Sequence, residues 1–264
     1  MNDKLILIAG PCVVESYELL EQTAGVLMAA CVGKDIDFIF KSSYKKANRT
    51  SKDSFTGIGD EKALGYLAEI RKKFGVRVLT DVHTADEARM AAEYTDILQI
   101  PAFLCRQTDL LQAAADTGRT VNIKKGQFMA PDSMKAAAEK ASGRGNGEIW
   151  LTERGASFGY HDLVVDYRSL VIMRSFGYPV IFDATHSVQK PSAGAQSGGS
   201  PEFVFPLARA AAAAGVDGIF FETHPEPHKA LSDAATQLPL AKAADFIGQV
   251  FSVWKFSKGY FDIL

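Results

Sequence analysis

The sequence predicts a (β/α)8 barrel, because eight short apolar runs alternate with amphipathic helical stretches along all 264 residues. The runs are nearly continuous in apolar residues, which indicates parallel strands buried on both faces. An α/β barrel commonly uses about 250 residues as one domain, and no linker interrupts the alternation. We therefore expect a single α/β domain over residues 1–264.

The predicted strands are six or seven residues long and rich in Ile, Val and Phe, which favour strands. They span residues 5–10, 37–43, 77–82, 97–102, 120–125, 148–154, 179–185 and 218–224. Apolar residues at helical spacing predict the intervening and final helices over 16–31, 60–74, 84–94, 107–117, 132–142, 167–176, 202–214 and 239–256. An open doubly wound sheet is the alternative, but no Gly-x-Gly-x-x-Gly string follows the first strand.

The composition excludes several classes of protein. Hydrophobic residues make up 47% and charged residues 23% of the chain, and the net charge is -2, so no global field attracts nucleic acid or a membrane surface. No apolar run reaches the roughly 18 residues of a membrane span. Three widely spaced cysteines argue against a disulfide framework, and the N-terminus does not resemble a signal peptide. We expect a cytoplasmic protein.

Basic residues gather at the carboxyl ends of the predicted strands. Lys41 ends the second strand and Lys46 follows it, Arg106 follows the fourth, Lys124 ends the fifth, and Arg154 ends the sixth. A single such residue is usually solvated, but several at one barrel mouth would repel one another unless an anion binds there. In a protein of net charge -2, this arc predicts a phosphorylated or carboxylated substrate.

Side chains of the types that bind metals follow the first, seventh and eighth predicted strands, which are adjacent in a closed barrel. Cys12 follows the first strand, His186 the seventh, Glu222 lies in the eighth, and Asp233 follows a short loop later. Each alone reads more simply as a packed or solvated residue. Together, at adjacent strand ends of a closed barrel, they form a mixed S/N/O set for one divalent ion. Such a set accepts Fe2+, Zn2+, Mn2+, Co2+ or Cd2+, and the sequence leaves this choice open.

The Gly/Ser-rich segment 192–200 follows the seventh strand. In a barrel it belongs to a βα loop on the active face, so we expect a lid that closes over the site. A plain surface loop is the alternative.

Five strings place the chain near a known family. Residues Lys41–Arg49, Gln99–Leu110, Lys124–Phe128, Thr152–Gly155 and Phe182–Gln189 closely resemble the 3-deoxy-D-manno-octulosonate 8-phosphate synthase family, in the right order on consecutive βα loops. The resemblance implies a transferase that condenses phosphoenolpyruvate with D-arabinose 5-phosphate and water and releases inorganic phosphate, in lipopolysaccharide biosynthesis. The family divides into members with Cys or Asn after the first strand, so Cys12 implies the metal-dependent class.

The resemblance also assigns roles to residues of this chain. It implies that Arg106 reaches a neighbouring active site in a homotetramer. It implies that phosphoenolpyruvate is bound by Lys41, Lys46, Gln99, Lys124 and Arg154, together with the backbone near Ala102. It implies that the aldose is bound by Asn48, Arg49 and Thr50.

Proton transfer and substrate choice leave alternatives open. Lys46 or His186 is a candidate proton donor to the aldehyde oxygen, and Asp233 or Asp81 a candidate acceptor from water. The related 3-deoxy-D-arabino-heptulosonate 7-phosphate synthases use erythrose 4-phosphate and typically carry Lys-Pro-Arg-Thr where this chain has Lys46-Ala-Asn-Arg49. A non-catalytic phosphosugar-binding barrel is the other alternative.

Overall fold

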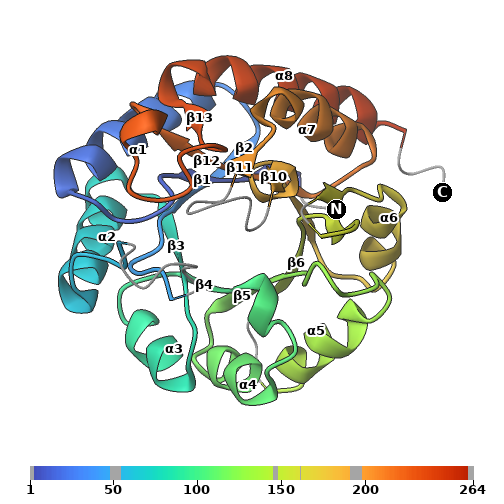
Figure 1. Ribbon diagram of the computed structural model, residues 1–264, viewed down its shortest axis with the longest axis horizontal. Helices are drawn as coiled ribbons and strands as arrows, with labels where there is room; N and C mark the ends of the chain where they lie inside the picture. The colour runs from blue at the N-terminus through green and yellow to red at the C-terminus, as the bar shows by residue number, and fades with distance from the viewer. Residues whose placement is uncertain (1–2, 48–54, 145–147, 161, 191–197, 261–264) are drawn as a thin grey trace.

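In the described part of the chain, eight parallel strands form a closed barrel that is surrounded by eight α-helices (Figure 1). The computed structural model describes residues 3–47, 55–144, 148–160, 162–190 and 198–260. The barrel strands are β1 (Leu5–Gly10), β2 (Ile36–Lys41), β3 (Arg77–Asp81), β4 (Ile97–Ile100), β5 (Thr120–Lys124), β6 (Ile149–Glu153), β9 (Val180–Asp183) and β12 (Gly218–His224). The helices are α1 (Tyr17–Cys31), α2 (Asp60–Phe74), α3 (Ala85–Ala91), α4 (Thr108–Asp116), α5 (Met134–Ser142), α6 (Arg168–Arg174), α7 (Val204–Ala213) and α8 (Ala243–Lys258).

The ring closes where the first barrel strand meets the last. Ile6 of β1 lies opposite Gly218 of β12, and the parallel register continues to Gly10 opposite Glu222. β12 also pairs with β9, which makes β9, β12 and β1 consecutive in the ring. This closure confirms the predicted (β/α)8 barrel and excludes the open sheet.

Two apolar layers hold the barrel together. The first fills its interior with side chains from alternating strand positions, as expected for this fold. Its members are Ile6, Ile8, Ile39, Leu79, Ile97, Trp150, Ile181 and Phe220. The second packs the outward-facing strand residues against the helices. Because every barrel strand is covered on both faces, the strands read as unbroken apolar runs.

Helix boundaries follow local capping chemistry. The Ser16 side chain accepts a hydrogen bond from Leu19 N at the start of α1, and Thr84 accepts one from Glu87 N at the start of α3. α2 ends at Gly75, whose φ of 64° suits the left-handed cap. Most helices begin one or two residues later than predicted, because the cap itself carries part of the periodic pattern.

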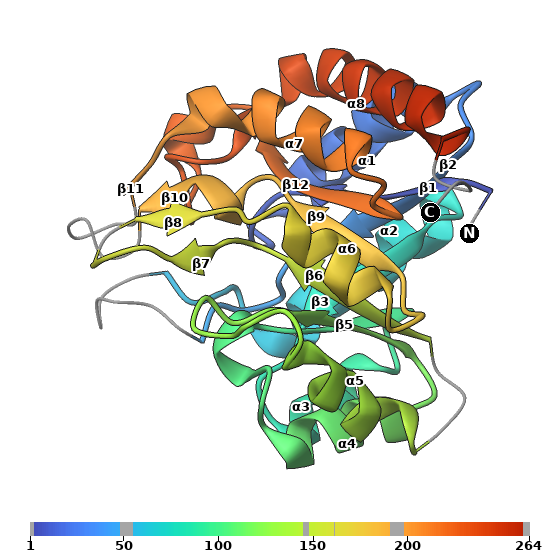
Figure 2. The ribbon, with the colours of Figure 1, turned by 90° about the vertical axis from the view of Figure 1, so that its right-hand side faces the viewer.

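Short strands that the sequence did not predict extend the active end of the barrel (Figure 2). β7 (Ala156–Ser157) pairs antiparallel with β8 (Leu163–Val164), and β10 (Gln189–Lys190) pairs with β11 (Gly198–Gly199). β13 (Leu238–Pro239) adds to the end of β12. The β10–β11 pair brackets the expected lid, whose residues 191–197 lie outside the described part of the chain.

Among the described residues, none of the helices has both the length and the apolar character that crossing a membrane requires.

Candidate active site

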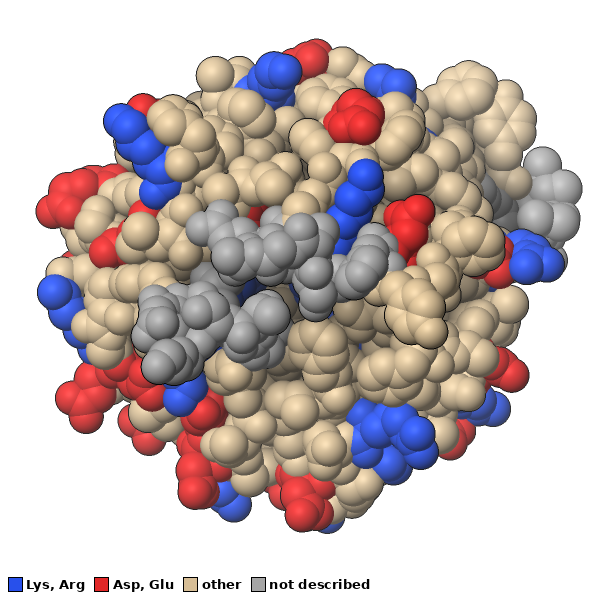
Figure 3. Space-filling model, viewed as in Figure 1, with Lys and Arg blue, Asp and Glu red and all other residues tan. Residues whose placement is uncertain are grey.

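The carboxyl ends of the barrel strands face one end of the molecule, which Figures 1 and 3 view head-on. The charged side chains visible in Figure 3 lie mainly around the periphery of this face. Those at the strand ends lie deeper: Lys41, Lys124 and Arg154 are at most 5% exposed. Burying cations in this way is unfavourable unless each has a partner or a ligand.

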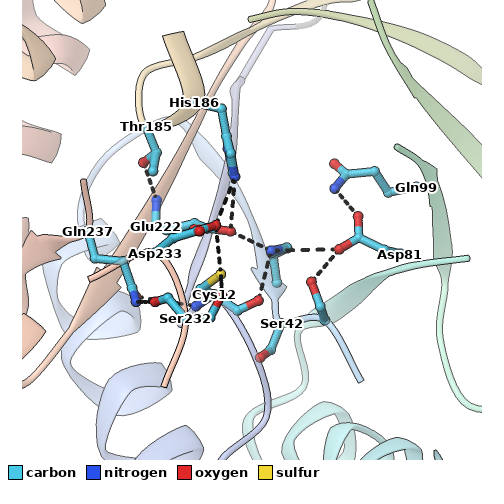
Figure 4. A network of polar contacts seen from close by, with 12 residues as sticks. Cys12, Ser42, Asp81, Gln99, Thr185, His186, Glu222, Ser232, Asp233 and Gln237 are labelled. Carbon is cyan, nitrogen blue, oxygen red and sulfur yellow. Dashed lines mark hydrogen bonds and ion pairs between the residues drawn. The ribbon is translucent and has the colours of Figure 1, made fainter. Parts of the chain in front are cut away.

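The four predicted metal ligands come together at the ends of β1, β9 and β12 (Figure 4). Ligand atoms of Cys12, Glu222 and Asp233 all lie within 4.8 Å of one another. His186 Nε2 lies 3.8 Å from Glu222 Oε1 and 3.7 Å from Asp233 Oδ2. These separations suit four ligands around one ion.

The chemistry of this cluster fits a metal. Glu222 Oε2 is buried and has no hydrogen-bond partner among the described residues. The His186 Nδ1 atom lies 2.8 Å from Asp183 Oδ2, which orients the ring and leaves Nε2 for an ion. The cluster therefore offers one thiol, one oriented imidazole and two carboxylates, and one carboxylate oxygen, Glu222 Oε2, has no hydrogen-bond partner among the described residues.

The Gln237 side chain helps to fix the Asp233 loop to the Cys12 loop. Gln237 Oε1 accepts a hydrogen bond from Cys12 N at 3.3 Å, and Gln237 Nε2 donates to Ser232 O at 2.8 Å. Asp233 itself has a φ of 47°, which is uncommon for a residue other than glycine. Backbone strain of this kind typically occurs at functional sites, where surrounding contacts maintain it.

Electrostatics favour a protonated thiol and ionised carboxylates at this cluster. Burial raises the pKa of the Cys12 thiol well above its usual range, and the nearby Asp233 and Glu222 carboxylates raise it further. Burial is the largest single influence on Glu222 and opposes its ionisation, but the positive charges of Lys41, His186 and Lys46 together outweigh burial and lower the pKa of that carboxyl. Lys41 Nζ lies 2.6 Å from Glu222 Oε1 and 3.2 Å from Cys12 O.

Close backbone packing places Lys41 against the group of possible metal ligands formed by Cys12, Glu222 and Asp233. A Cβ on Gly10 would lie 2.1 Å from Lys41 O, so only glycine allows β1 and β2 to approach at this point. Lys46, half-buried nearby, is surrounded by negative groups. Burial disfavours its charged form, but Cys12, Glu222, Asp81 and Asp233 together raise the pKa of Lys46.

Two cations line the other side of the mouth. Lys124 Nζ lies 2.6 Å from Asp183 Oδ2 and 3.4 Å from His186 Nδ1, and burial lowers the pKa of Lys124 despite Asp183. Arg154 donates to Gln189 Oε1 at 3.0 Å, but its buried Nη1 has no partner among the described residues. A guanidinium group with an unused, buried N–H face suits an oxyanion ligand.

The other predicted site residues differ in how closely they approach this mouth. Gln99 and Asp81 are buried at the ends of neighbouring strands and are hydrogen bonded to each other. Ala102 is buried at the start of the short helix η1 (Ala102–Leu104). Arg106 is exposed just beyond η1, and its carbonyl accepts from Lys140. Asn48, Arg49 and Thr50 lie outside the described residues.

Comparison with known proteins decides the family. The model of the DAHP synthetase I family matches residues 1–254. The chain belongs to this family. A protein of Trichlorobacter lovleyi named 2-dehydro-3-deoxyphosphooctonate aldolase is 55% identical over 239 residues, which cover 90% of this chain and 88% of that protein. Proteins of the same name from Aromatoleum aromaticum and Koribacter versatilis are 56% and 57% identical, over 92% and 90% of this chain and 88% and 86% of their own lengths.

These relatives confirm the resemblance on which the sequence interpretation rested. The structure also brings to this mouth residues that were not among the predicted site residues. Asp183 bridges Lys124 and His186, and Gln237 joins two loops. The buried pair of Lys125 and Glu153, 3.4 Å apart, supports the turn that carries Arg154. Asp183 and Glu153 end apolar strands, and this position was the available signal.

Proposed function

We propose that the protein condenses phosphoenolpyruvate with D-arabinose 5-phosphate and water to form 3-deoxy-D-manno-octulosonate 8-phosphate and inorganic phosphate, in lipopolysaccharide biosynthesis. This proposal rests on the similarity of the chain to relatives named 2-dehydro-3-deoxyphosphooctonate aldolase, which are 55–57% identical over about nine-tenths of the chain. The mouth supports the proposal chemically, because buried cations suited to a phosphorylated substrate lie beside a cluster of metal-type ligands.

We infer that Cys12, His186, Glu222 and Asp233 hold one divalent ion. The unpaired Glu222 Oε2 and the Asp183-oriented imidazole support this assignment. When bound, such an ion polarises an oxygen ligand or lowers the pKa of a bound water. The donor set suits Fe2+, Zn2+, Mn2+, Co2+ or Cd2+.

Phosphoenolpyruvate carries a phosphate and a carboxylate on one carbon, so it needs several cations at fixed spacing. We assign this role to Lys41, Lys124 and Arg154, with Lys46 beside them. Arg154 Nη1 is the free donor best placed for an oxyanion among the described residues, because it is buried and unpaired. Gln99 and the backbone at Ala102 complete the proposed site.

The carbon–carbon bond forms between C3 of the enol phosphate and the aldehyde carbon, and the aldehyde oxygen then needs a proton. Lys46 or His186 donates it in our proposal, because Lys46 remains charged among its negative neighbours. Water adds at C2 and loses a proton to Asp233 or Asp81. Elimination of phosphate from C2 completes the reaction.

We assign the aldose to Asn48, Arg49 and Thr50, and its distal phosphate in part to Arg106 of an adjacent subunit in a homotetramer. Exposure of Arg106 on the described surface is compatible with this arrangement. We expect the protein to act in the cytoplasm, where phosphoenolpyruvate is made.

Two assays test the proposal. Phosphate release is measured with arabinose 5-phosphate and erythrose 4-phosphate separately, each with phosphoenolpyruvate. We expect turnover with arabinose 5-phosphate; turnover with erythrose 4-phosphate alone would identify the heptulosonate reaction instead. Ligand binding without phosphate release from either aldose would indicate a binding barrel.

Removing the metal with a chelator tests the second inference. We expect activity to disappear and to return with added divalent ion. Full turnover by a metal-free preparation would place the protein among the metal-independent members despite Cys12.

A further inference from the structure

A row of buried polar side chains crosses four adjacent barrel strands, β3 to β6, and continues to Ser43 in the segment that follows β2. Thr152 Oγ1 lies 2.6 Å from Asn122 Oδ1, and Asn122 Nδ2 lies 2.9 Å from Gln99 Oε1. Gln99 Nε2 in turn contacts Asp81 Oδ1, and Ser43 Oγ contacts Asp81 Oδ2. Figure 4 shows the Gln99–Asp81 contact.

The barrel builds this row through strand register. Asp81 lies opposite Gln99 in the β3–β4 pair, and Gln99 lies opposite Asn122 in the β4–β5 pair. Asn122, Thr152 and Ser43 are fully buried, and Gln99 is 1% exposed. Side chains this deep must satisfy one another, because water cannot do so.

The chemistry of a carboxylate sets the direction of every hydrogen bond in the row. An ionised Asp81 only accepts, so Gln99 must present its NH2 group to Asp81 and its oxygen to Asn122. Asn122 must then present its NH2 group to Gln99, and its oxygen accepts from the Thr152 hydroxyl. Every hydrogen-bond donor in the row therefore points toward Asp81. The charge on Asp81 thus determines which end of the Gln99 and Asn122 amides is oxygen and which is nitrogen.

The row ends beside Lys41, one of the lysines that we propose to bind the substrate. Asp81 Oδ2 lies 4.0 Å from Lys41 Nζ, so the carboxylate is a counter-ion for a cation that we assign to phosphoenolpyruvate. Both Asp81 oxygens already accept hydrogen bonds from Gln99 and Ser43. A carboxylate held in this way is a poor proton acceptor, because hydrogen bonds to its charged form stabilise that form.

We propose that Asn122 and Thr152 are positioning residues that act through Gln99 to hold Asp81 as a second, fixed counter-ion of Lys41, beside the closer Glu222. This inference rests on the proposed function and narrows it: Asp81 orients a substrate cation and does not take the proton from water. The strand-six hydroxyl thereby influences a lysine on strand two without touching substrate.

Matched variants at Thr152 test the row. Thr152→Val keeps the shape of the side chain and removes the donor, while Thr152→Ser keeps the hydroxyl. Asn122→Asp keeps its size but removes the NH2 group that Gln99 requires. The main measurement is the dissociation constant for phosphoenolpyruvate by calorimetry on the metal-loaded protein, with kcat/KM for both substrates beside it.

We expect Thr152→Val to weaken phosphoenolpyruvate binding about threefold to tenfold and Asn122→Asp about tenfold or more, as a lost hydrogen bond implies. Thr152→Ser should remain within about twofold of the wild type, which a purely packing role would not produce. In an Asp81→Asn background, the effect of Thr152→Val should fall to within about twofold, because the row no longer ends on a charge.

The proposal is overturned if Thr152→Ser weakens binding as much as Thr152→Val, or if the Thr152→Val effect is unchanged in the Asp81→Asn background. Circular dichroism checks folding; should Asn122→Asp fail to fold, the Thr152 pair still decides the matter. A wild-type protein that binds phosphoenolpyruvate but turns over neither aldose would refute the proposed reaction alone. Failure to bind phosphoenolpyruvate at all would refute both.

Discussion

Loading the metal should release the Cys12 proton. In the metal-free protein the thiol stays protonated near neutral pH, because burial raises its pKa and the Asp233 and Glu222 carboxylates add to the effect. A metal binds the thiolate, so loading must displace about one proton. Below the thiol pKa, apparent metal affinity should therefore rise about tenfold for each unit of pH.

The same binding should stabilise the fold by a measurable amount. Free metal at one hundred times its dissociation constant adds about 2.7 kcal/mol to the free energy of unfolding. In a domain of this size each kcal/mol raises Tm by about 2 °C. We thus expect a rise of about 5 °C, lost on adding a chelator.

Calorimetry counts the proton directly. Zn2+ is titrated at one pH into buffers that differ in ionisation enthalpy, with wild-type protein and with Cys12→Asn. Because Cys31, Cys105 and His186 remain in both proteins, the difference between them isolates Cys12. The expected difference is about one proton per site. Equal proton release from the two proteins would refute the reasoning.

Three further perturbations have definite expected outcomes. Lys41→Met leaves Glu222 buried without its ammonium partner and should cost about 3–5 kcal/mol in urea unfolding of the metal-free protein, with a smaller loss once metal is bound. Gly10→Ala forces a Cβ to within 2.1 Å of Lys41 O and should lower both Tm and kcat, whereas Gly65→Ala, with open space around it, should not. Glu87, although partly desolvated, has its pKa lowered to about 2 by hydrogen bonds from His83 and Lys45. The ionised Glu87 carboxylate stabilises the fold fully above its ordinary pKa near 4.5, and this stabilisation is lost as pH falls toward 2. Glu87→Gln should therefore reduce the loss in the free energy of unfolding over this pH range by about 2 kcal/mol.

Much of the fold could be predicted because the barrel strands are buried on both faces. The predicted run 5–10 is identical to β1, and the predicted run 218–224 is identical to β12. The β7–β8 and β10–β11 pairs were missed because two residues per strand carry no detectable period. Their pairing depends on contacts formed after the barrel closes.

The sequence could predict only those site residues that adjoin the ends of the barrel strands. Cys12, His186 and Glu222 each adjoin a barrel strand, so ring order alone brought them together. The strand-end position of Asp183 could be predicted, but its contacts and those of Gln237 could not, because they depend on loop paths and on which side-chain face meets a neighbour. Single-residue spacing carries no information about such contacts.

Closure of the barrel by its first and last strands has a consequence for synthesis of the protein. Cys12 is translated more than 200 residues before Asp233, and their contact spans 221 positions. A growing chain therefore exposes one soft ligand long before the two carboxylates that complete the set exist. We expect the complete ligand set to form only once β12 docks on β1, because Glu222 lies in β12 and Asp233 follows it in sequence. Occupancy of the cluster would then report that translation reached at least the loop beyond β12.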